Sequence, residues 1–297
     1  MTYTLEANEN QIAKIHAYYA FFSIPSKNQY ARYMFKLPKV TITVYNSNKV
    51  VFQGEASIIE YEKWQESKAV KLVTEKVFSK STSSIGSDEV GTGDYFGPII
   101  VVSAYIDEPI KQKLANFSIT DSKKLTDKYI LEIGEILKRQ VPHKLLICDN
   151  KKFNSLHQKG YNMNKIKALM HNRALYDLAA KKTAKKIIVD QFTSVNSYFR
   201  YLKDQEEIVK DITFETKAES KYFAVAAASI IARYSFLKYF EDMKKATGYN
   251  LLKGASSKVD EVAAKIIEEK GLVYLYNISK ISFKNTKKAL AIYEQKK

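Results

Sequence analysis

The chain has 297 residues, about twice the length of a typical domain, and its 45% hydrophobic and 27% charged residues suffice for a packed core. No run of 18 uncharged apolar residues is present, and Glu6 and Glu9 stand where a secretory signal carries basic residues. We therefore expect a cytoplasmic protein without a membrane span. The single cysteine, Cys148, excludes an internal disulfide and a paired-thiolate zinc site, so carboxylates are the expected ligands of any metal.

The net charge of +16, from 48 basic and 32 acidic residues, favours a polyanionic partner such as nucleic acid. Only five of the basic residues are arginine. Lysine meets phosphate as a point charge, whereas arginine is the usual reader of guanine, so backbone contacts are favoured over base reading. A biased genome composition is an alternative source of the lysine excess.

The first part of the chain has the pattern of a small α/β module over residues 1–78. We expect helices over residues 5–20 and 59–77, and strands over residues 41–45 and 50–53. The strands are separated by Asn46, Ser47 and Asn48, a turn composition. A polar stretch without aromatics at residues 79–84 predicts a linker.

The rest of the chain, residues 85–297, predicts a second and larger α/β domain. The expected strands are 85–89, 99–106, 144–149, 186–190 and 208–214, and the expected helices are 126–140, 163–182, 218–246, 257–270 and 284–296. The first two strands resemble a hairpin, and βα alternation follows them. This order predicts a mixed sheet flanked by helices.

Four acidic residues lie where a charge is costly without a partner. Asp88 and Glu89 end an apolar strand, Asp190 ends another, and Glu219 opens an alanine-rich helix whose dipole favours a carboxylate. Neighbouring strand residues face opposite sides, so Asp88 and Glu89 serve one site only if the chain turns beside them. Each residue alone fits an ordinary capping role. As a group, clustered carboxylates would select hard divalent cations such as Mg²⁺ or Mn²⁺.

The glycine-containing segment 87–98 offers backbone amides to an anion or a sugar hydroxyl. It lacks the third glycine of a dinucleotide fingerprint and the lysine of a P-loop. A plain hairpin turn is the alternative interpretation.

Four ordered segments resemble the motifs of the type 2 ribonucleases H, and specifically of the ribonuclease HIII family. They are SDEVGTGDYFGP at 87–98, TDSKKLTDK at 120–128, IIVDQF at 187–192 and FETKAESKYFAVAAASIIARY at 214–234. Glu219 and the GTG at 91–93 favour the HIII branch, because the HII branch usually has Asp and GRG there. VTITVYNSNKVVFQG at 40–54 resembles the TATA-binding-protein-like module that precedes the catalytic domain in this family.

The resemblance implies a ribonuclease H-like catalytic domain that cleaves the RNA strand of RNA–DNA hybrids with two Mg²⁺ or Mn²⁺ ions, leaving 5′-phosphate and 3′-hydroxyl ends. It implies that Asp88, Glu89, Asp190 and Glu219 are catalytic, metal-binding carboxylates. The substrate-binding residues that it implies are Gly91, Thr92 and Gly93 at ribose 2′-hydroxyls, and Ser122, Lys123 and Lys124 near phosphates. We expect a monomer without an obligate protein partner.

Two alternatives remain open at this point. One is an HII-like activity that incises single ribonucleotides embedded in duplex DNA. The other is a non-catalytic protein that only binds hybrids, which the presence of all four carboxylates argues against.

Overall fold

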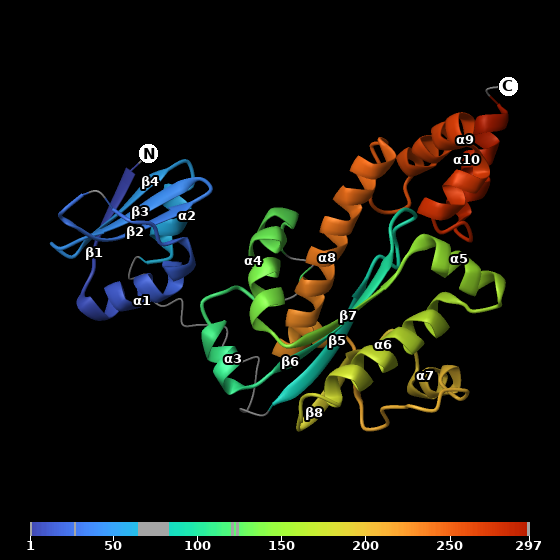
Figure 1. The fold of residues 1–297 in the computed structure, drawn as a ribbon, viewed down its shortest axis with the longest axis horizontal. Helices are drawn as coiled ribbons and strands as arrows, with labels where there is room; N and C mark the ends of the chain where they lie inside the picture. The colour runs from blue at the N-terminus through green and yellow to red at the C-terminus, as the bar shows by residue number, and fades with distance from the viewer. Residues whose placement is uncertain (1, 27, 65–82, 120–121, 123–124, 296–297) are drawn as a thin grey trace. The chain divides into compact units, whose positions relative to one another are not determined.

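The structure is a computed structural model, and it describes residues 2–26, 28–64, 83–119, 122 and 125–295. The chain divides into two compact units, Met1–Val73 and Thr74–Lys297 (Figure 1). Most of the predicted linker at 79–84 lies outside the described residues; of its last two residues, Ser84 already belongs to a strand.

The N-terminal unit is a four-stranded antiparallel sheet with helices packed on one face. Its strands are β1 (Thr2–Glu6), β2 (Ala31–Leu37), β3 (Val40–Tyr45) and β4 (Lys49–Gly54), in the order β1-β4-β3-β2. The helices are α1 (Glu9–Tyr19) and α2 (Ser57–Glu62), with the short turn η1 (Ala20–Phe22) after α1. Alternate strand residues such as Phe35, Ile42 and Phe52 are buried against Ile12 and Ile15 of α1.

This unit confirms the predicted small α/β module but differs from it in detail. The helix expected over residues 5–20 begins only at Glu9, since residues 2–6 pair with β4 as an edge strand. Strand β2 was not predicted. Of the helix expected over 59–77, the structure describes α2 and two further residues, and the remainder lies outside the described residues. The likeness to a TATA-binding-protein module stays a prediction.

The C-terminal unit is built on a five-stranded mixed sheet. Its strands are β5 (Ser84–Val90), β6 (Ile99–Ile106), β7 (His143–Cys148), β8 (Lys186–Asp190) and β9 (Thr213–Glu215), in the order β7-β6-β5-β8-β9. Strand β5 is the centre: it pairs antiparallel with β6 and parallel with β8. The mixed sheet and its initial hairpin are as predicted.

Helices cover both faces of this sheet (Figure 1). On one face lie α8 (Phe223–Thr247) and α4 (Asp127–Gln140), and on the other α6 (Met163–Ala179). The remaining elements are α3 (Glu108–Lys113), α5 (Asn150–Gln158), α7 (Val195–Tyr201), the short turn η4 (Ala218–Ser220), α9 (Ser257–Ile278) and α10 (Lys284–Glu294). By length and composition α8 resembles a membrane span, but it packs on β5 and β6, and two-thirds of its most apolar stretch is buried.

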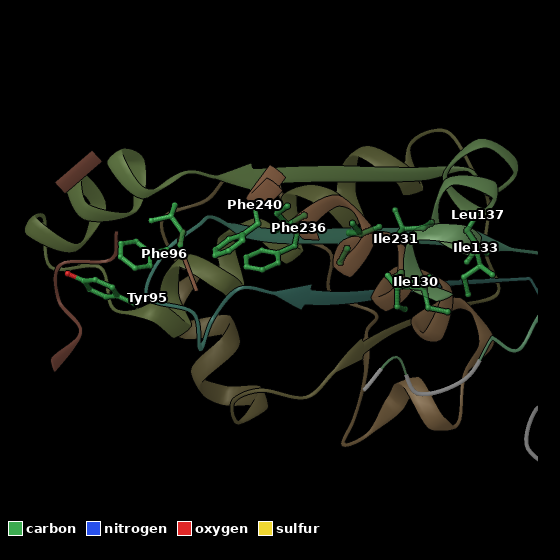
Figure 2. Close-up of a cluster of buried hydrophobic side chains, with 14 of the residues drawn as sticks. Tyr95, Phe96, Ile130, Ile133, Leu137, Ile231, Phe236 and Phe240 are labelled. Carbon is green, nitrogen blue, oxygen red and sulfur yellow. The ribbon is translucent and has the colours of Figure 1, made fainter. Parts of the chain in front are cut away.

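The main hydrophobic core lies between the sheet and the α4–α8 layer (Figure 2). Its side chains come from the loop after β5, from α4 and from α8: Tyr95, Phe96, Ile130, Ile133, Leu137, Ile231, Phe236 and Phe240. The alanines of α8 let the helix backbone approach the sheet closely. At Gly86 of β5, an added Cβ would lie only 2.2 Å from the backbone nitrogen of Val225.

Several predicted elements need correction. The helix expected over 218–246 is two elements, η4 and α8, because Tyr222 between them has an extended backbone conformation. The strand expected over 208–214 is only β9. The helix expected over 257–270 ends as predicted at the non-helical Gly271, beyond which α9 continues to Ile278, and the last helix ends at Glu294. Helices α3, α5 and α7 were not predicted.

Candidate active site

Asp88 and Glu89 lie inside the central strand β5 and face opposite sides of the sheet. The strand continues to Val90, so the expected turn does not bring the two side chains to one face. Asp88 accepts a hydrogen bond from Ser229 of α8, whereas Glu89 contacts Lys167 and His171 of α6. The first acidic pair is therefore divided between the two helical layers.

Asp88 has Asp190 as its neighbour on the α8 side. The parallel register pairs Ser87 with Val189, and Asp190 is the next residue and the last of β8. Burial, and then the negative charges of Glu89 and Asp190, raise the pKa of Asp88. The site thus concentrates negative charge where water is largely excluded, as Asp88 is 8% exposed.

Glu219 joins this side of the sheet through η4 and not through the long helix. Ala218, its neighbour, donates its backbone N–H to Asp190 Oδ1 at 2.9 Å and packs with Ile188 and Val225. Glu219 itself is buried. The prediction that it opens the alanine-rich helix was wrong, so the dipole of α8 is not what stabilises it.

Glu89 is bound to two side chains of α6. Lys167 Nζ lies 2.9 Å from Glu89 Oε1, and His171 Nε2 lies 2.9 Å from Oε2. Burial alone would raise the pKa of Glu89, but His171 and Lys167 together hold it below its usual range. Glu89 is therefore an ionised, fully engaged carboxylate.

Of the four predicted carboxylates, Asp88 and Asp190 are thus neighbours on the α8 side, and Glu89 lies on the α6 side. Glu219 is buried in η4, next to the Ala218 that bonds Asp190. Within the residues that the structure describes, no three His, Cys, Asp or Glu side chains are arranged to bind a single ion as they stand. The chemistry of the donors nevertheless fits a hard divalent cation, because burial and then the charges of Glu89 and Asp190 raise the pKa of Asp88, and a bound cation would offset this negative charge.

The glycine segment after β5 is partly closed and partly open. Gly91 has a φ of +88°, and a Cβ there would meet the Pro98 carbonyl oxygen at 2.0 Å. At the exposed Gly93, a Cβ would meet nothing within 4 Å. Thr92 is half-buried between them. Backbone at residues 92–93 is therefore accessible to a ligand, while Gly91 serves the turn itself.

The far end of this segment is held by a buried lysine from the C-terminal part of the unit. Lys280 is fully buried, and its Nζ donates to the carbonyl oxygens of Asp94 at 2.7 Å and Gly97 at 2.5 Å. Burial lowers the pKa of Lys280 to about 7. The segment is thus fixed at residues 94–97 and open at residues 92–93.

Of the three predicted phosphate-facing residues, only Ser122 is described; Lys123 and Lys124 lie outside the described residues. Ser122 is buried, its hydroxyl lies 2.8 Å from that of Ser229, and its carbonyl accepts a hydrogen bond from Arg233. Ser122 therefore links its segment to the helix that contacts Asp88.

Asp127 differs from the solvated helix start that its position indicates. It pairs with Arg233 at 2.7 Å and also with Lys253, and although its partial burial alone would raise its pKa, these contacts lower it. Asp127 thus contributes to holding Arg233, which in turn bonds Ser122.

Sequence reasoning missed Lys167, His171 and Ser229. The first two are four residues apart on one helix, a spacing that places them on one face. A buried lysine and histidine on the face that covers a sheet are a signal that a carboxylate partner is near. Ser229 lies in an alanine-rich run without any comparable signal.

Comparisons with known proteins agree with this architecture. The family model described as Ribonuclease HII matches residues 85–286, and one described as a domain of unknown function (DUF3378) matches residues 3–76. A Ribonuclease HIII of Listeria monocytogenes is 42% identical over 296 residues, which is 96% of each chain. One of Bacillus cereus is 39% identical over 303 residues, 97% of each chain.

Solved structures show the same relationship. Bst-RNase HIII, determined in complex with Mn²⁺, is 40% identical, superposes with a TM-score of 0.71, and the match covers 99% of this chain and 100% of that one. The ribonuclease H2 of Pyrococcus horikoshii OT3, 24% identical with a TM-score of 0.61 over 72% of this chain and 99% of that one, shares the fold. Near-complete coverage at about 40% identity shows that the chain belongs to the ribonuclease HIII family and is a ribonuclease H enzyme.

Proposed function

We propose that the protein is an endoribonuclease that hydrolyses the RNA strand of RNA–DNA hybrids by two-metal-ion catalysis, leaving 5′-phosphate and 3′-hydroxyl ends. The observation that carries the proposal is that Asp88 and Asp190 are neighbours at the ends of β5 and β8, with the turn that carries the buried Glu219 bound to Asp190 through the Ala218 N–H. Two bound Mg²⁺ or Mn²⁺ ions would supply an activated water and stabilise the leaving oxygen.

In this proposal the chain's own residues hold the acidic groups in place. Ser229 orients Asp88 through a hydrogen bond, and the backbone N–H of Ala218 orients Asp190. Glu219 is held by the short turn η4 against β8 and α8. Glu89 is the fourth proposed ligand, and it must leave part of its contact with α6 to reach the others. Fixed ligands reduce the reorganisation that the reaction requires.

Discrimination of RNA from DNA is proposed for the open part of the glycine segment. Backbone amides at Thr92 and Gly93 are accessible, and a 2′-hydroxyl is the group that marks a ribonucleotide. Gly91 supports this role by closing the turn against Pro98. Lys123 and Lys124 remain proposed phosphate contacts, with Ser122 holding their segment to α8.

The N-terminal unit is proposed to bind substrate through the sheet face that its helices leave uncovered. Alternation along β1, β3 and β4 places Thr2, Thr41 and Gln53 side by side on this face, because Thr2 and Thr41 both pair with Gln53, and none of the three is buried. Such a face can lie on a duplex without reading base sequence.

Deleting residues 1–80 should leave a folded enzyme whose hybrid affinity falls more than its turnover. Unchanged affinity would remove this role.

The decisive test is Asp88→Asn, which removes a ligand charge and keeps the side-chain size. We expect multiple-turnover cleavage of a hybrid in Mg²⁺ or Mn²⁺ to fall at least a thousandfold, about 4 kcal/mol of transition-state stabilisation. Hybrid binding should stay nearly intact. Asp242→Asn, at an exposed position of α8, is the matched control and should be silent. Activity of the Asp88 variant within tenfold of the parent would reject the assignment.

Specificity is tested with two labelled duplexes of equal length, one with a central run of ribonucleotides and one with a single ribonucleotide. We expect cleavage of the run and poor incision of the single site, because each 2′-hydroxyl contact that is lost costs about 1 kcal/mol. Equal cleavage of both in Mg²⁺ would favour the HII-like alternative. Absence of cleavage with intact binding would favour the non-catalytic one.

A further inference from the structure

The α6 side of the sheet carries a buried polar group that the proposed chemistry leaves unused. Lys167 Nζ and His171 Nε2 each lie 2.9 Å from a different oxygen of Glu89. The side chains of Lys167 and His171 are only 9% and 0% exposed, so neither is a surface residue that meets Glu89 by chance. Both oxygens of Glu89 are thus engaged by the protein itself.

The two α6 side chains are themselves held rigidly. His171 Nδ1 lies 2.7 Å from the hydroxyl of Ser87, and its ring stacks on Phe192 at 5.1 Å between centroids. Lys167 Nζ lies 4.0 Å from the centroid of the same Phe192 ring. Ser87 belongs to β5, two residues before Glu89, so strand and helix are cross-linked at both ends of the imidazole.

The charge of Lys167 has a direct consequence for any cation that binds Glu89. An ammonium group in contact with Oε1 neutralises that oxygen and repels a second positive charge, most strongly where water is scarce. A divalent cation that takes Glu89 as a ligand must therefore compete with Lys167. His171 opposes the same movement, because it holds Oε2 toward α6 by a hydrogen bond.

We propose that Lys167 and His171 are positioning residues that retain Glu89 on the α6 side, and that Lys167 competes with the divalent cation for this carboxylate. The inference deepens the proposed function and rests on Glu89 being a metal ligand. In this arrangement Glu89 is the exchangeable member of the site, while Asp88, Asp190 and Glu219 are its fixed members. Lys167 and His171 thereby determine the concentration of free cation at which the proposed metal site is filled.

The test measures binding of Mn²⁺ alone to the full-length protein by titration calorimetry, without substrate. Lys167→Met removes the ammonium and keeps an aliphatic chain beside Phe192, and it should tighten Mn²⁺ binding at least fivefold. Lys165→Met is the matched control. Lys165 belongs to the same helix, its ammonium lies 3.9 Å from the centroid of the Tyr161 ring just before that helix, and its loss should change the affinity less than twofold. Unfolding curves in EDTA verify folding, and Lys167→Gln replaces the Met variant if that one does not fold.

A double-mutant cycle separates competition at Glu89 from a general effect of charge. Glu89→Gln should weaken Mn²⁺ binding, and adding Lys167→Met to it should produce at most a third of the gain seen in the parent. If Lys167→Met leaves Mn²⁺ binding unchanged or weakens it, while Glu89→Gln still weakens Mn²⁺ binding, Lys167 does not compete with the cation. Glu89 then remains a metal ligand, and the proposed function is unaffected. Mn²⁺ affinity unaffected by Glu89→Gln overturns the role of Glu89 as a ligand and the inference with it.

Discussion

Gly86→Ala should destabilise the catalytic unit more than an ordinary core substitution. The added Cβ would lie 2.2 Å from Val225 N, 2.4 Å from Ala224 C and 2.7 Å from Val225 Cα. All three atoms belong to the backbone of α8, which cannot rotate aside as a side chain does. Overpacking that side chains can absorb costs about 1–3 kcal/mol, so we expect at least about 3 kcal/mol here. This corresponds to a fall of about 6–12 °C in Tm.

The measurement is urea unfolding of the full chain, followed by cleavage assays under conditions where the variant is folded. Cleavage should fall as well, because a displaced α8 carries Ser229 away from Asp88. Gly93→Ala is the control: its Cβ has open space, so stability should stay within about 0.5 kcal/mol. A loss below about 1 kcal/mol for Gly86→Ala would refute the argument that α8 packs rigidly on β5.

Three further predictions concern charge. In EDTA, Asp88→Asn should unfold at a higher temperature than the parent. The raised pKa of Asp88 means that the parent loses stability as the pH rises from about 4 toward 8, and the variant should not show this loss. Thermal unfolding of both proteins at pH 6 and at pH 8 measures the difference. The lowered pKa of Lys280 means that the unfolded chain binds more protons above pH 7, so the parent gains up to about 1.4 kcal/mol per pH unit between pH 7 and 9. Lys280→Met should lack this gain, and an identical pH slope would contradict the assignment. Asp127→Asn should lower the free energy of unfolding in urea by about 1 kcal/mol, because it weakens the contacts with Arg233 and Lys253. An unchanged free energy of unfolding would show that these two contacts do not contribute to stability.

Local signals predicted the elements whose ends are set by their own residues. Thr126, the first residue of the helix predicted over 126–140, caps α4 by accepting a hydrogen bond from the Tyr129 N–H, and Gly248 ends α8 in the left-handed conformation. The mixed sheet also followed from the order of strand and helix patterns. Strand β1 was missed because its partner β4 lies some 50 residues away, and no local pattern identifies an edge strand that short.

The residue types of the proposed site follow from sequence motifs, but their arrangement does not. Motifs pointed to four carboxylates, yet the helical pattern of residues 218–246 gave no sign of the extended residue Tyr222 that separates η4 from α8. The division of Asp88 and Glu89 between two helical layers also depends on β5 remaining regular through Val90. Partners supplied by other elements, such as Lys167 for Glu89, become visible only when α6 is placed on the sheet.

The central position of β5 also determines when the enzyme becomes active during its synthesis. Asp190 and Glu219 follow Asp88 by 102 and 131 residues, and β8 and α8 must both dock on β5 before the acidic groups meet. Contacts this distant in sequence form late in folding, because a long loop must close first. We therefore expect a ribosome-bound chain that has not yet exposed α8 to lack the proposed site, and cleavage to begin only after most of the second unit has emerged and folded.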